Sequence, residues 1–165
     1  WGVKIEYVNE EKPLGTAGSI GLLPKNLPKL PILMMNGDVL TKVNFEHLLA
    51  FHQEQKGIAT MCIREYDVQI PFGVVNVEEQ QAKSIVEKPI EKFFVNAGIY
   101  VLEPELVNKV NPNTHIDMPN LLEKQIKEGR SVSIFPIHEY WLDIGHMKEY
   151  ESAHDSFSNG FTLDD

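Results

Sequence analysis

Two apolar segments, far apart in the sequence, each bring an aspartate next to a glycine turn. Residues 31–35 form a continuous apolar run that leads into Asn36-Gly37-Asp38, and the segment Trp141-Leu142-Asp143-Ile144-Gly145 repeats the arrangement. In an α/β protein this pattern places a carboxylate at the mouth of the sheet, where ligands usually bind. Asp38 and Asp143 are therefore predicted to share a hard, oxygen-ligated ion such as Mg²⁺. An ordinary turn at residues 36–38, with Asp143 capping a helix that begins near residue 146, fits the same residues, and both interpretations stay open.

Length and composition indicate one globular domain. A chain of 165 residues with 42% hydrophobic content can bury one substantial core, so we expect a single domain over residues 1–165. No apolar run reaches the length of a membrane span and no signal-peptide pattern opens the chain, so we expect a cytoplasmic protein. The chain begins with Trp1 and its first residues resemble the middle of a domain, so we expect a fragment that is incomplete at its N-terminus.

Charge and cysteine content argue against a nucleic-acid-binding surface and against a CxxC site. The net charge of −9 argues against a broad nucleic-acid-binding surface, which needs clustered Lys and Arg. An anionic ligand would be held locally, by a divalent cation, one or two Lys residues and backbone N–H groups. The single cysteine, Cys62, lies in an apolar run without a CxxC spacing, and we expect a buried thiol that packs in the core.

The first forty residues predict a short strand, a glycine-rich loop and a buried strand. Residues 3–8 alternate as a strand does, and residues 13–19 then pack two glycines, an alanine and two hydroxyl residues before an apolar stretch. Small residues in such a loop let the backbone approach a ligand. For an isolated loop we favour another interpretation, in which Gly15 supplies a positive φ and Thr16 caps the following helix.

The middle of the chain predicts a parallel unit followed by an extension. The strand that ends at Asp38, a helix over residues 44–55 capped by Asn44, and a strand over residues 58–64 form a βαβ unit, which indicates a parallel sheet. His47 and His52 are five residues apart on that helix, a spacing unsuited to a shared ligand, and we expect both at the surface. Short strands over residues 72–77, 82–87 and 94–102 predict an antiparallel or mixed extension at the sheet edge.

The last third predicts two helices, a strand and a final helix. The helices cover residues 104–110 and 118–128, with Gly129 as a stop, and the strand covers residues 131–136. An amphipathic segment over residues 146–157 follows the Trp141–Gly145 motif.

Six short motifs together resemble one enzyme family, the sugar-1-phosphate nucleotidyltransferases, or nucleoside-diphosphate-sugar pyrophosphorylases. In chain order, the motifs are Pro13-Leu14-Gly15-Thr16-Ala17-Gly18, Asn36-Gly37-Asp38, Phe72-Gly73-Val74-Val75, Val86-Glu87-Lys88-Pro89, Asn96-Ala97-Gly98-Ile99-Tyr100 and Trp141-Leu142-Asp143-Ile144-Gly145. The first motif is most similar to guanylyltransferases that act on mannose 1-phosphate and related sugars. One branch of these carries its catalytic domain after a pair of regulatory CBS domains, so the resemblance allows such domains upstream in the parent chain.

The resemblance implies a fold, a reaction and a set of roles. The implied fold is Rossmann-like, with a mixed, mainly parallel sheet flanked by helices (the nucleotide-diphospho-sugar transferase fold), truncated at its N-terminus. The implied reaction transfers a nucleotidyl unit from an NTP, with GTP favoured, to a sugar 1-phosphate with release of pyrophosphate, and a homo-oligomer is compatible with it. The implied roles are catalysis by Asp38, Asp143 and Lys88; Mg²⁺ binding by Asp38 and Asp143; nucleotide binding by Glu10, Glu11, Pro13, Gly15 and Gly18; and sugar-phosphate binding by Gly73, Glu87, Lys88, Asn96 and Gly98.

The sequence departs from the family pattern in two places. A GGxGxRL loop, which in the family cradles the triphosphate, does not occur in these residues, so we expect this segment alone to be inactive. His146 and Met147 stand where many relatives have Thr-Pro. Asp117 also matches a recurrent stretch of the family, and we interpret it as a helix cap.

Two other functions remain open on the sequence. A non-catalytic module could keep this fold to bind a nucleotide sugar or to mediate assembly, although such a module has no need of both Asp38 and Asp143. A glycosyltransferase of related fold is expected to carry an Asp-x-Asp motif, of which residues 36–38 have only the second acid.

Overall fold

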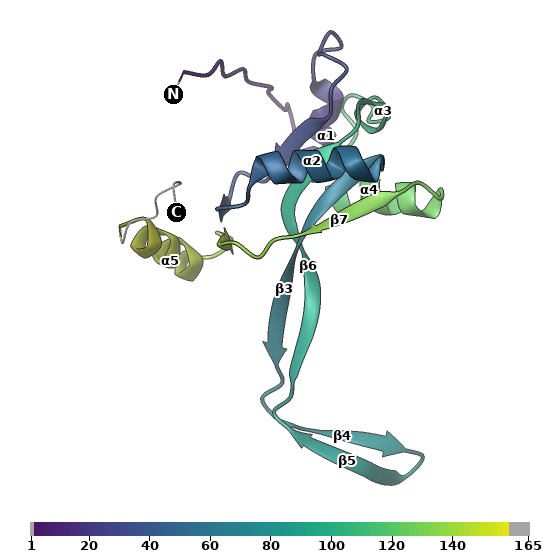
Figure 1. Cartoon of the computed structure of the whole chain (residues 1–165), viewed down its shortest axis with the longest axis vertical. Helices are drawn as coiled ribbons and strands as arrows, with labels where there is room; N and C mark the ends of the chain where they lie inside the picture. The colour runs from purple at the N-terminus through teal and green to yellow at the C-terminus, as the bar shows by residue number, and fades with distance from the viewer. Residues whose placement is uncertain (1, 159–165) are drawn as a thin grey trace.

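The computed structural model describes residues 2–158, apart from the side chains of residues 148, 152 and 156–158 (Figure 1). Its strands are β1 (Ile32–Met35), β2 (Val39–Thr41), β3 (Ala59–Gln69), β4 (Gly73–Glu78), β5 (Gln81–Glu87), β6 (Ile90–Leu102), β7 (Val132–Pro136) and β8 (Trp141–Asp143). Its helices are α1 (Gly15–Gly18), the 3₁₀ helix η1 (Ser19–Leu22), α2 (Phe45–Gln55), α3 (Pro104–Val107), α4 (Met118–Lys127) and α5 (Met147–Ser158). None of the described helices is long and apolar enough to cross a membrane.

The central sheet is mixed, as predicted, and has the strand order β1-β6-β3-β7. Contrary to expectation, its pairing is not mainly parallel, because among its described strands only the β3–β7 pair is parallel. β7 runs parallel to β3, whereas β6 is antiparallel to both β1 and β3, so that three of the four strands point the same way. The predicted βαβ unit corresponds to β1, α2 and β3. β6 lies between its two strands, although residues 94–102 were expected at the edge.

The central position of β6 follows from its composition. Residues 97–102 are all buried, because the side chains of this run face a core on both sides of the sheet. Tyr100 and Leu102 pack with α4 residues in one cluster, and Ile99 and Val101 pack with Leu48 of α2 in the other. A strand that is buried on both faces reads as a continuous apolar run.

The other half of β6 pairs with β3 to form a ribbon that leaves the sheet. Its register runs from the Arg64–Val95 pair to the Gln69–Ile90 pair, and the β4–β5 hairpin follows at the far end. Figure 1 shows this hairpin well away from the helices. We call residues 64–95, which comprise the ribbon and the hairpin, the arm.

Two predictions about local structure are wrong. Residues 3–8 form no strand; Val3, Ile5 and Tyr7 are exposed, because no neighbouring described strand pairs with this segment. His52 was expected at the surface but is only 1% exposed. It lies one helical turn after the buried Leu48 and therefore faces the core, whereas His47 is exposed as predicted.

Candidate functional site

The two aspartates predicted to share an ion lie on one small antiparallel ladder. β2 pairs with β8 in the register that places Val39 opposite Asp143. One position further along, the Ile144 N–H donates to the Asp38 carbonyl oxygen over 2.8 Å. The backbone thus brings Asp38 and Asp143 onto neighbouring positions, and both residues are exposed.

The Asn96-Ala97-Gly98 motif lies beside this ladder. The Asn36 N–H donates to the Gly98 carbonyl over 2.8 Å, and the Trp141 indole N–H donates to the Ala97 carbonyl over 2.8 Å. Gly98 has φ +71°, and a Cβ at this position would lie 2.8 Å from the side-chain nitrogen Nδ2 of Asn36. A glycine is therefore required there. Three of the six sequence motifs meet at this point.

Asn96 is held by its own local hydrogen bonds. Its side-chain oxygen accepts from the Gly98 N–H over 3.0 Å, and its side-chain nitrogen donates to the Tyr100 hydroxyl over 2.6 Å. Burial raises the pKa of Tyr100, so this phenol stays neutral at ordinary pH. The side chain of Asn96 is thereby fixed relative to the β2–β8 ladder.

A cavity of about 450 Å³ opens beside Asp143. Tyr66 and Trp141 contribute aromatic walls, and Asp143, His146 and Glu149 contribute polar groups. Glu149 Oε2 is buried and has no hydrogen-bond partner in the described part of the chain. A buried carboxylate oxygen without a partner is costly, and a donor or cation of a bound ligand would satisfy it.

The available ligands suit a metal ion whose coordination is completed by the substrate. No group of three or more His, Cys, Asp or Glu side chains with metal-binding geometry occurs among residues 2–158. Mg²⁺ is commonly bound by one or two carboxylates together with substrate phosphates and water. Asp38 and Asp143 fit that kind of site, and their binding of Mg²⁺ stays a prediction.

The residues predicted to bind the sugar phosphate divide between two places. Asn96 and Gly98 lie beside the aspartates, but Gly73, Glu87 and Lys88 lie at the base of the hairpin. Gly73 pairs with Glu87, and the Lys88 N–H donates to the Phe72 carbonyl over 3.2 Å. Seven residues lie between Lys88 and Asn96, and the extended part of this segment, from Ile90 to Asn96 in β6, alone spans roughly 20 Å. In this structure Lys88 and Glu87 are thus not brought to Asp38 and Asp143, contrary to the site that the sequence predicts.

The residues predicted to bind the nucleotide form a compact loop. The Leu14 N–H donates to Glu10 Oε2 over 3.3 Å, and Glu11 and Pro13 are exposed beside it. Gly15 has φ +77°, as predicted. A Cβ on Gly18 would lie 2.7 Å from the Thr114 carbonyl oxygen, so this glycine permits close packing of the loop on residues 114–118.

The caps at this loop differ from those predicted. Thr16 does not cap its own helix: its hydroxyl accepts from the Met118 N–H of α4 over 2.8 Å. Asp117 occupies the N-cap position of α4, but its side chain makes no cap bond there and accepts instead from the Thr16 N–H over 3.0 Å. The helix-cap interpretation of Asp117 holds for its position and not for its side chain.

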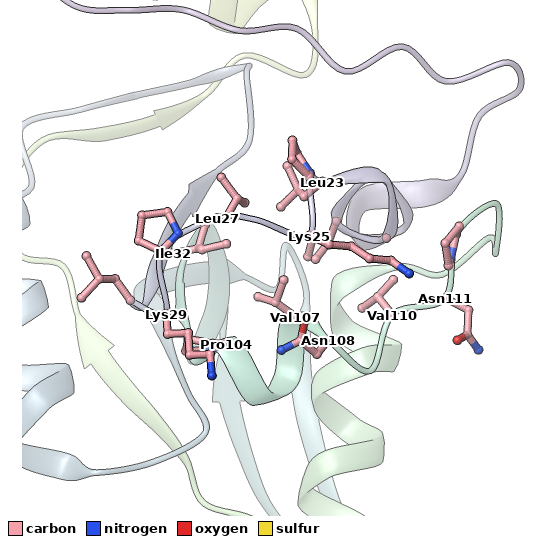
Figure 2. Close-up of a pocket in the computed structure, with 16 residues that line it drawn as sticks. Leu23, Lys25, Leu27, Lys29, Ile32, Pro104, Val107, Asn108, Val110 and Asn111 are labelled. Atoms are coloured by element: carbon pink, nitrogen blue, oxygen red, sulfur yellow. The ribbon is translucent and has the colours of Figure 1, made fainter.

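A second cavity, of about 280 Å³, lies at the other end of β1 (Figure 2). Apolar side chains that include Leu23, Leu27 and Val107 line it, and Lys25 and Lys29 contribute charged groups. It contains none of the residues that the motifs predict.

Sequence reasoning missed several of these contacts. Three features depend on which side chains meet across the fold: the bond of the Trp141 indole, the place of Glu149 in the cavity, and the bond between Thr16 and Asp117. No local spacing reveals them. The indole of Trp141 had a signal, since a Trp within a functional motif usually finds a partner for its N–H.

Comparisons with known proteins point to one family. Residues 1–160 match the family model described as nucleotidyl transferase. The mannose-1-phosphate guanyltransferase of Debaryomyces hansenii is 32% identical over 93% of this chain, and that of Pichia angusta is 33% identical over 93%. The chain spans only 44% of the length of each of these relatives.

Solved structures share the fold. The crystal structure of HddC from Yersinia pseudotuberculosis has a TM-score of 0.69 and 22% identity, covering 95% of this chain and 68% of that chain. A complex of the same protein with GMP-PN has a TM-score of 0.67 and 22% identity, over 93% of this chain and 67% of that one. The match over residues 1–160 shows that this chain belongs to the nucleotidyl transferase family.

Proposed function

We propose that this chain is part of a sugar-1-phosphate nucleotidyltransferase that uses an NTP, with GTP favoured, and releases pyrophosphate. The observation that carries the proposal is the meeting of three motifs at the β2–β8 ladder, where the backbones of Asp38 and Asp143 occupy adjacent positions close to Asn96 and Gly98. The mannose-1-phosphate guanyltransferases among the relatives and the GMP-PN complex of a structural neighbour support a guanine nucleotide.

The reaction requires positioning and charge neutralisation and needs no covalent enzyme intermediate. An oxygen of the sugar 1-phosphate attacks the α-phosphorus of the NTP; the new P–O bond forms as the bond to the bridging oxygen breaks, and pyrophosphate leaves with that electron pair. Asp38 and Asp143 would hold a Mg²⁺ ion, which when bound neutralises phosphate charge. Asn96, fixed by Tyr100 and by the Gly98 N–H, would border the sugar.

Lys88 would pair with the phosphate of the sugar. A single Lys at this position suits a phosphate, because its ammonium group is a compact point charge with three donors. From its place in this structure it would need a movement of the arm toward the ladder, as in enzymes whose sites assemble on closure.

The test is pyrophosphate release by the full-length protein that contains these residues, with GTP and either mannose 1-phosphate or glucosamine 1-phosphate. Asp38→Ala and Asp143→Ala should each lower turnover by about 100-fold or more, because each removes a ligand of the Mg²⁺ ion that would neutralise the negative charge of the transition state. Asp67→Ala, which changes an exposed aspartate of the arm, is the matched control and should retain turnover. Normal turnover in the Asp38 and Asp143 variants would refute the proposal.

The alternative is a non-catalytic module that binds a nucleotide sugar or mediates assembly. The separation of Lys88 from the aspartates in this structure favours it. GDP-mannose binding by the full-length protein, without turnover of any NTP and sugar 1-phosphate pair, would support this alternative.

A further inference from the structure

Reciprocal hydrogen bonds fasten the glycine-rich loop to the start of α4. The Thr16 N–H donates to Asp117 Oδ1 over 3.0 Å, and the Met118 N–H donates to Thr16 Oγ1 over 2.8 Å. Two backbone bonds flank this pair: the Ile116 N–H donates to the Leu14 carbonyl over 2.8 Å and the Ala17 N–H to the Ile116 carbonyl over 2.9 Å. We call the paired side-chain bonds the Thr16–Asp117 clasp.

The backbone of the loop packs closely against the clasp. A Cβ on Gly15 would lie 2.7 Å from both Asp117 Oδ1 and the Ile116 carbonyl oxygen. The backbone of the loop therefore packs directly on the carboxylate. A displacement of Asp117 would displace Gly15 and Thr16 with it.

The side chain of Asp117 acts across the fold and not on its own helix. An aspartate at an N-cap usually accepts from an N–H two or three residues later. Here the carboxylate makes no such bond, and Thr16 supplies an acceptor to α4 in its place. The exchange of caps leaves the carboxylate free to hold the loop.

We propose that Asp117 is a positioning residue of the nucleotide site, which holds the Gly15–Thr16 backbone in the conformation that receives the base. This inference rests on the proposed function, in which residues 10–18 bind the nucleotide. Asp117 belongs to a different element from Asp38 and Asp143, so its loss should weaken nucleotide affinity without removing the groups that act on the phosphates.

The binding test uses a fluorescent GTP analogue and the full-length protein. Asp117→Ala should weaken binding roughly five- to twenty-fold, the effect of losing about one hydrogen bond and loosening the loop. Asp117→Asn keeps an acceptor oxygen and should stay within about three-fold of wild type. Asn44→Ala is the matched control, because Asn44 also accepts a backbone N–H near a helix start, over 2.9 Å, but caps α2. It should leave the affinity unchanged.

Steady-state kinetics and amide hydrogen exchange complete the test. Asp117→Ala should raise the KM for GTP while kcat and the KM for the sugar phosphate change little, and the Thr16 amide should exchange faster. Unchanged GTP affinity together with faster exchange at Thr16 would overturn the positioning role, and unchanged exchange would overturn the clasp itself. A wild-type protein that binds no nucleotide would overturn the proposed function together with this inference.

Discussion

Cys62 shows how strongly the sheet changes the chemistry of a single residue. Burial raises the pKa of its thiol from 9.0 to about 12, and the negative charge of Glu139 adds to the shift. Between pH 9 and about pH 12 the unfolded chain loses this proton while the folded chain keeps it. The stabilising contribution of the buried thiol is therefore complete below pH 9 and is lost as the pH rises toward 12.

The free energy of unfolding should therefore fall more steeply above pH 9 in wild type than in Cys62→Ala. Urea denaturation at several pH values between 8 and 11 measures the two slopes. Burial raises the pKa of Tyr100 in both proteins, whereas the charge of Cys62 adds to this shift in wild type only, so it steepens the wild-type slope in the same direction. Parallel slopes would show that Cys62 titrates normally in the folded chain.

The sequence predicts those features of single residues that depend on near neighbours in the chain. The Asn44 cap, the positive φ of Gly15 and the buried Cys62 all follow from residues close by in the chain. Asp117 is different, because its acceptor role depends on Thr16, about a hundred residues earlier. A pattern read along one segment cannot identify a partner on another.

Among the elements, a buried histidine adds polar contacts to the apolar packing that holds α2 on the sheet. His52 Nδ1 lies 2.8 Å from the hydroxyl of the buried Thr60 on β3, and Nε2 lies 3.2 Å from Glu103 Oε1 at the end of β6. The side chain thus connects three segments from within the core. Removing it would leave the Thr60 hydroxyl without a partner and open a cavity.

His52→Ala should lower the free energy of unfolding by about 2–4 kcal/mol. The matched control is His47→Ala on the same helix, which should change it by less than about 0.5 kcal/mol because His47 is exposed and its backbone N–H keeps the bond to Asn44. Chemical denaturation of the three proteins measures both effects. Equal losses in the two variants would contradict the structural role of His52.

Element types were easier to predict than element neighbours. The helices over residues 45–55 and 118–127 and most strands follow from periodicity. The insertion of β6 between β1 and β3 does not, since a run buried on both faces has no preferred neighbour. The same holds for the site: the sequence names Asp38 and Asp143, and only the β2–β8 register brings their backbones to adjacent positions.

Over the whole molecule, the arm is the feature that motif reasoning leaves out. The motifs at Gly73 and at Glu87 and Lys88 predict a site shared with the aspartates, but the structure carries them to the end of a long ribbon. Sequence order cannot reveal this, because the angle and length of the ribbon depend on how far the pairing of β3 with β6 continues beyond the core.

The arm also exposes many apolar side chains. Phe72, Ile85 and Phe94 are exposed by 72%, 68% and 69%. Large apolar patches on a soluble chain usually contact another surface, and a two-stranded ribbon also has free edges for pairing. We therefore expect the 165-residue chain to self-associate as its concentration rises.

Replacing Phe72, Ile85 and Phe94 together by Thr should shift the chain toward the monomer in sedimentation velocity, because Thr retains strand propensity while removing apolar area. The matched control replaces Val3, Ile5 and Tyr7 by Thr, which removes exposed apolar side chains outside the arm. If the arm drives association, the arm variant should dissociate at concentrations where the control remains associated. A wild-type chain that stays monomeric at all concentrations, or two variants that dissociate alike, would show that the exposed arm has no special affinity for a second copy.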